Sequence, residues 1–93
     1  MTLEQFESAR TLNINIDVAN GRIDGLADTI NSLRYLKYDL GRETATLQIT
    51  ATGGSENFVV QSINLLDLIY FLKKQKSDWE DEVKRLKEEF DKL

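Results

Sequence analysis

The chain has 93 residues, 41% of them hydrophobic, and a formal net charge of −4 from 12 basic and 16 acidic residues. This length suits a single domain, residues 1–93, whose small core leaves apolar surface uncovered, and the acidic balance argues against a general nucleic-acid binder. Cysteine and histidine are both absent, which excludes disulfides, thiolate metal sites and the commonest general base, so we expect no catalytic residue, metal or cofactor.

The sequence opens without the basic and apolar stretches of a signal peptide, and no run of about eighteen apolar residues follows. We therefore expect a soluble protein of the cytoplasm that does not enter a membrane. Proline is absent as well, which fits a chain built mainly from long uninterrupted helices.

Apolar residues recur at alternating steps of three and four from residue 9 to residue 40, and only Lys37 interrupts them. This spacing predicts a coiled-coil helix over residues 3–40, capped by Thr2 and ended by Gly41, with one apolar seam. The seam consists of Ala9, Leu12, Ile16, Ala19, Ile23, Leu26, Ile30, Leu33, Lys37 and Leu40.

Residues 12–18 carry a competing signal, because they alternate apolar and polar side chains and precede Asn20-Gly21, a common hairpin turn. A strand is therefore the alternative here. The returning strand is missing, however, and the heptad pattern crosses the stretch without a skip, which favours the helix. Gly21 and Gly25 then each cost about 1 kcal/mol against alanine and mark a bend or a close helix contact.

Two segments beyond Gly41 alternate with period two, and Thr52-Gly53-Gly54-Ser55-Glu56 joins them. They predict a β-hairpin over residues 44–63, with Ile49 opposite Phe58 and Leu47 opposite Val60. A lone two-stranded ribbon is marginal in water, so we expect it to pack on a helix or pair with another subunit.

A second helix is predicted over residues 65–93, capped by Asn64. Its seam consists of Leu65, Ile69, Leu72, Lys76, Trp79, Val83, Leu86, Phe90 and Leu93. If the hairpin turns the chain back, the two seams match along their length, with Leu26 facing Trp79 and Ala19 facing Leu86. The expected fold class is mainly α with a β-hairpin, an antiparallel helical coiled-coil hairpin.

We also expect a homo-oligomer, because the first eleven residues overhang the second helix, the hairpin edges are open and one helix pair cannot cover both seams. The predicted oligomer interface consists of Leu3, Phe6, Ile49, Phe58 and Val60.

A basic zone is expected at the hairpin end of the coiled coil, where segments 34–42 and 67–77 meet with a local charge of +4. It consists of Arg34, Tyr35, Lys37, Tyr38, Arg42, Tyr70, Lys73, Lys74 and Lys76. Lysines at the seam positions 37 and 76 either set register and oligomer number or bind an anionic ligand such as a nucleotide.

The chain opens with MTLEQFESAR, continues with a heptad helix and a hairpin with an isoleucine-threonine strand and glycine turn, and ends in a charged helix closing with EEFDKL. This pattern resembles small uncharacterised proteins of bacteriophages and prophages of gut bacteria. The resemblance covers the whole chain and implies a phage accessory protein, but it identifies no functional residues. The element order is also similar to the β subunit of prefoldin, in topology only.

Many phage proteins of this kind counter host defences by binding a host protein or by sequestering a nucleotide signal. We therefore expect a non-enzymatic, oligomeric coiled-coil binding protein that acts on a host protein. The alternatives are a sponge for an anionic nucleotide at the basic zone and a structural, prefoldin-like scaffold.

Overall fold

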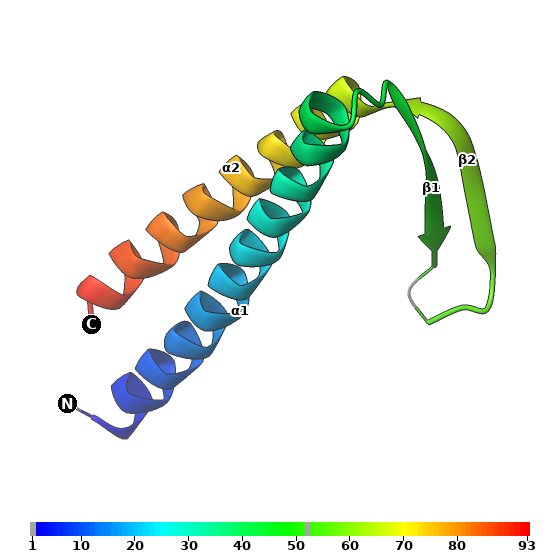
Figure 1. Ribbon diagram of the computed structural model, residues 1–93. Coiled ribbons are helices and arrows are strands. Elements are labelled where there is room, and N and C mark those ends of the chain that lie inside the picture. Colours follow the sequence, from blue (N-terminus) through cyan, green and yellow to red (C-terminus); the bar gives the residue numbers. More distant parts are fainter. Residues whose placement is uncertain (1, 52) are drawn as a thin grey trace.

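The computed structural model describes residues 2–51 and 53–93; Met1 and Thr52, the latter in the predicted hairpin turn, lie outside the described residues. The elements follow in the order α1 (Leu3–Arg34), η1 (Tyr35–Asp39), β1 (Thr44–Thr50), β2 (Asn57–Asn64) and α2 (Leu65–Asp91). The two long helices lie side by side and antiparallel, and the β-hairpin extends from their shared end (Figure 1). The predicted helix–hairpin–helix fold is confirmed.

Helix α1 begins at a capping box, in which the Gln5 amide donates to Thr2 Oγ1 (3.1 Å) and the Thr2 amide donates to Gln5 Oε1 (3.0 Å). Both bonds satisfy amides that the first helical turn leaves without partners. Residues 12–18 are helical, so the strand alternative is wrong. The helix also crosses Gly21 and Gly25 without interruption, because the seam packs against α2 on both sides of them.

The end of the first helical arm differs from the prediction of an α-helix to residue 40. The α-helix ends at Arg34 and continues as a five-residue π-helix, η1. The Leu40 amide donates to the Tyr35 carbonyl (3.2 Å), which is the wider turn of a π-helix. Gly41 follows with φ of +67°, a conformation that glycine adopts without steric cost. The predicted role of Gly41 in ending the helix is confirmed.

Helix α2 begins as predicted at Asn64, whose side-chain oxygen accepts hydrogen bonds from the amides of Leu66 (2.9 Å) and Asp67 (3.2 Å). The helix ends at Asp91, two residues short of the predicted end. The Leu65 amide donates to the Glu43 carbonyl (3.0 Å). This bond joins the two chain segments that connect the hairpin to the helices.

The β-hairpin has the predicted register near its turn, with Ile49 opposite Phe58 and Leu47 opposite Val60. A β-bulge that the pattern did not predict lies nearer the helices, between the pairs Leu47–Val60 and Ala45–Ile63. Ser62 in the bulge has φ of +58°, which is uncommon for a residue other than glycine. Because β2 holds one extra residue there, Ile63 returns to the face that carries Val60.

The core is a narrow layer between α1 and α2. Over the described ranges 2–51 and 53–93, every buried hydrophobic residue belongs to one of the two predicted seams: Ala9, Ala19, Ile30, Leu65, Ile69, Val83 and Leu86. The radius of gyration is 17.9 Å, whereas a compact globular domain of this length has about 12 Å. The protomer is therefore elongated, and much of its apolar surface stays outside the core.

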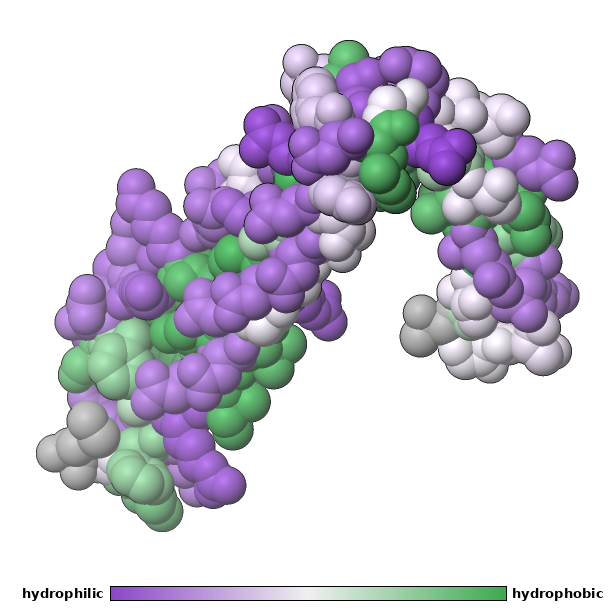
Figure 2. Space-filling model, viewed as in Figure 1, coloured by the Kyte–Doolittle hydropathy of each residue, from purple (hydrophilic) through white to green (hydrophobic). Residues whose placement is uncertain are grey.

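Hydrophobic surface is gathered along the helix pair and again on the β-hairpin, between bands of hydrophilic residues (Figure 2). Among residues 2–51 and 53–93, no helix combines the length and apolar character needed to cross a bilayer. The uncovered apolar surface is therefore gathered in stripes and patches (Figure 2).

Candidate functional site

Lys37 occupies its predicted seam position with only 16% of its side chain exposed, and its Nζ lies 3.2 Å from Glu43 Oε2. The ammonium group also lies 5.9 Å from the centroid of the Tyr38 ring. A cation at a seam position is costly unless it finds an anion. Here the anion is Glu43, the residue that directly follows the predicted basic segment 34–42.

Two further lysines of the basic zone have acidic neighbours on α2. Lys76 Nζ lies 2.9 Å from Glu80 Oε1, and Lys74 Nζ lies 3.9 Å from Asp78 Oδ2. Both carboxylates lie just beyond the predicted segment 67–77, so a charge count over that segment omitted them. The zone is therefore less basic than its local charge of +4 indicated.

The remaining members of the basic zone are spread around the end of the helix pair. Arg34, Tyr70 and Lys73 occupy heptad positions b and e, on one flank of the coiled coil, whereas Lys74 lies at an outer f position. Tyr35 lines a separate groove of about 460 Å³ with Asn31, Ser32 and Leu36. Arg42 follows Gly41 in the connection to β1. Tyr38, which follows the seam residue Lys37, is also at a b position, so the fold brings four of the nine residues to one flank and distributes the others.

The hairpin residues predicted for the oligomer interface are exposed in the protomer. Ile49, Phe58 and Val60 have exposed fractions of 45%, 57% and 41%, and the register places all three on the same face of the ribbon. β1 and β2 form a sheet of two strands only, so each strand has an unpaired edge. Of the two expected arrangements, packing on a helix is not the one that the protomer adopts, because the ribbon extends away from both helices (Figure 1). Pairing with another subunit stays a prediction.

The first turns of α1 extend past the C-terminal end of α2 (Figure 1), as predicted. Leu3 and Phe6 in these turns are 72% and 58% exposed. Leu12 is half-buried and borders a groove that also contains Glu89 of α2. The covered part of the first seam therefore begins at the buried Ala9, and Leu3 and Phe6 before it face solvent in the protomer.

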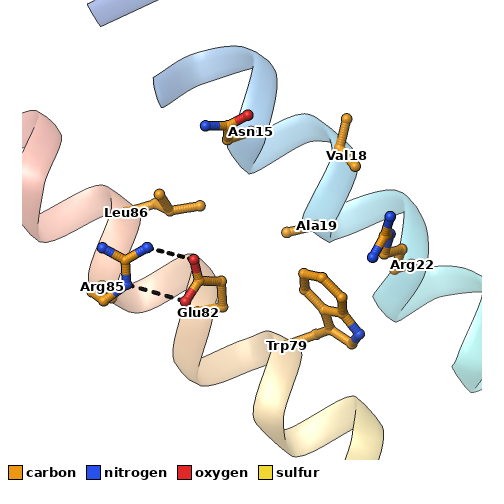
Figure 3. A pocket seen from close by; sticks show the side chains of 8 residues that line it. All are labelled: Asn15, Val18, Ala19, Arg22, Trp79, Glu82, Arg85 and Leu86. Carbon is orange, nitrogen blue, oxygen red and sulfur yellow. Dashed lines mark hydrogen bonds and ion pairs between the residues drawn. The ribbon is translucent and has the colours of Figure 1, made fainter. Parts of the chain in front are cut away.

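A groove that the sequence reasoning missed runs along the other flank of the helix pair, and we call it the helix groove. Its two parts, of about 230 and 550 Å³, share Arg22 and Trp79. The Arg22 guanidinium lies over the Trp79 ring, 4.5 Å from its centroid, between the helices (Figure 3). The lining residues are Asn15, Val18, Ala19, Arg22, Gly25, Leu26, Thr29, Phe71, Leu72, Gln75, Trp79, Glu82, Arg85 and Leu86.

One signal for this groove was present in the sequence. Val18 and Phe71 are apolar although they occupy heptad c positions, outside the seams, and both are more than half exposed. Apolar residues at such flanking positions widen the hydrophobic stripe of a helix beyond a single seam. The pattern thus indicated a second contact surface on this flank.

The charges at one end of the helix groove form a network on α2. The side chain of Arg85 donates hydrogen bonds to Glu82 and to Glu89 (Figure 3 shows the pair with Glu82). The hydrogen bonds from Arg85 to Glu82, and then the guanidinium charge, lower the pKa of Glu82 below its ordinary value of 4.5. Arg85 is thereby occupied within the protomer, whereas the described residues form no ion pair with Arg22.

Among the described residues no group of three or more aspartate or glutamate side chains is placed to hold a metal ion. Comparison of the chain with protein-family models, curated proteins and solved structures found no match.

Proposed function

We propose that this chain is a non-enzymatic, oligomeric binding protein that holds a partner protein on its projecting β-hairpin. We further propose a phage accessory protein whose partner is a protein of the bacterial host. The phage assignment is supported by the resemblance of the opening MTLEQFESAR, the heptad helix and the closing EEFDKL.

The observation that carries the proposal is the unpartnered ribbon. A two-stranded sheet needs a third strand or a packed helix to be stable in water, and β1 and β2 have neither beyond their connection to the helices. An edge strand pairs readily with an extended segment of another protein, while side chains on one face provide specificity. Ile49, Phe58 and Val60 form such an apolar face.

Two neighbouring positions on β2 provide a matched test. Phe58 and Val59 are each 57% exposed but lie on opposite faces of the ribbon. A photo-crosslinking amino acid at position 58 should attach to one host protein in a bacterial lysate, and the same group at position 59 should attach far less.

In the full chain, Phe58→Lys should abolish recovery of that host protein and Val59→Lys should preserve it. Crosslinking at position 58 to the protein's own chain alone would instead assign the hairpin to self-pairing, as in a scaffold, and would refute the proposal. Equal effects at both positions would also contradict it.

A second candidate function is sequestration of an anionic nucleotide. It is favoured by Arg34, Tyr70 and Lys73, which share one flank of the coiled coil and offer two cations and a 64% exposed ring.

A bound nucleotide at a hundred times its dissociation constant would add about 2.7 kcal/mol to the free energy of unfolding. A thermal-shift screen with mono-, di- and cyclic nucleotides tests this, with Lys73→Gln expected to remove the shift and the ion-paired Lys74→Gln to retain it. The absence of a shift with every nucleotide would leave the hairpin proposal as the better one.

A further inference from the structure

We infer that the helix groove is the surface on which a second copy of this chain docks. This inference deepens the proposed function, because it names the surface that joins the copies and leaves the hairpins free for a partner. It concerns residues of α1 and α2 that the sequence did not assign to any interface.

The groove flank and the opposite flank of the helix pair differ in chemistry. On the groove side, Val18 and Phe71 are 51% and 58% exposed, beside the half-buried Leu26, Leu72 and Trp79 that line the groove. The opposite b and e positions have exposed apolar or aromatic side chains towards the two ends of the helix pair, at Phe6, Tyr38, Leu66 and Tyr70. Between these ends they carry mainly polar and charged side chains: Asn13, Asp17, Asn20, Asp24, Asn31, Glu80, Lys84 and Lys87. The groove side therefore combines exposed and half-buried apolar side chains along the helix pair.

The protomer exposes 7084 Å², whereas a folded monomer of 10.7 kDa is expected to expose about 5,500 Å². The excess of about 1,600 Å² per copy includes the surface of the projecting β-hairpin. It is larger than the roughly 800 Å² per partner of a standard interface, so it leaves room for a dimer contact along the helices. A second copy is the occupant that can cover this excess on every protomer at once.

The backbone of α1 points to the same partner. A Cβ added at Gly25, which lines the groove, would meet nothing within 4 Å in the protomer. The protomer's own packing thus gives no reason for a glycine at this position of the helix, where it is unfavourable. Close approach of another helix in the groove gives that reason, since a missing Cβ lets two backbones come near.

The charges of the groove are self-complementary. Arg22 on α1 and Glu82 on α2 line the same part of the groove from opposite sides. A two-fold axis parallel to the helices places α1 of one copy over α2 of the other, so Arg22 of each copy faces Glu82 of its neighbour. The interface then contains two equivalent contacts between opposite charges around an apolar centre.

Adjacent residues allow a matched test on the full chain. Phe71 lines the groove, whereas Tyr70 is similarly exposed (64% against 58%) on the opposite flank. In sedimentation velocity at tens of micromolar, the native chain should be larger than 10.7 kDa. Phe71→Glu should weaken association about a hundredfold, because it places an unpaired charge in the interface, and Tyr70→Glu should leave the mass unchanged.

A second pair of variants excludes misfolding as the cause. Gly25→Leu improves helix propensity, and a Cβ at this position meets no atom within 4 Å in the protomer, so helicity should be retained while the association is lost. Asn20→Leu, on the other flank, should retain both. A monomeric native chain, or an unchanged mass for both Phe71→Glu and Gly25→Leu, would overturn the inference. If the crosslinker at position 58 attaches to no host protein while the native chain still sediments as an oligomer, the result counts against the hairpin proposal alone.

Discussion

Replacing Lys37 by leucine should stabilise the protein, although the change removes an ion pair. The Lys37 side chain is 16% exposed, while its partner Glu43 is 74% exposed. An ion pair with one partner in solvent contributes about 0–1 kcal/mol, whereas burying a leucine side chain contributes about 1.5–3 kcal/mol. The covered methylene groups of Lys37 already provide part of that apolar gain. We expect a net increase of about 1 kcal/mol in the free energy of unfolding.

Thermal unfolding followed by circular dichroism at one fixed protein concentration measures this gain. For a domain of this size, 1 kcal/mol corresponds to a rise in Tm of about 4–8 °C. Lys74→Leu is the matched control, because Lys74 is 77% exposed and its ion pair is longer, at 3.9 Å, so its Tm should stay unchanged. A lower Tm for Lys37→Leu would refute the reasoning. It would mean that the Lys37 ammonium group contributes more to the free energy of unfolding than an ion pair with an exposed partner does.

Two further outcomes are expected. Ser62 adopts φ of +58° in the β-bulge, so Ser62→Gly should keep the contact between Leu47 and Val60 in NMR spectra. Ser62→Val should lose this contact, because a β-branched residue is strongly disfavoured at positive φ; retention by both variants would contradict this. Because Arg85 lowers the pKa of Glu82, this carboxylate stabilises the fold above its unfolded-state pKa and loses that contribution as the pH falls through the lowered folded-state value. Glu82→Gln should therefore flatten the acid limb of stability measured by urea unfolding, and an acid limb identical to that of the native chain would argue against the pair.

Periodicity in the sequence was enough to predict the helical hairpin. The three-four spacing of apolar residues identified every buried hydrophobic residue, because helix geometry alone decides which residues share a face. The same logic chose the helix over the strand at residues 12–18, and local side-chain chemistry identified Thr2 and Asn64 as caps. These features depend on residues only a few positions apart, so the linear sequence contains their physical cause.

The candidate sites depended on contacts between distant segments. The ion pair of Lys37 with Glu43 and the stacking of Arg22 on Trp79 arise only once the connection and the helix register are set. The β-bulge at Ser62 and the π-helix at Tyr35–Asp39 change the face on which the following residues lie, and a strict sequence period does not predict such a change. The helix groove needed both helices in place, since Val18 and Phe71 lie on different helices and come to the same flank, in different parts of the groove, only after the chain folds back.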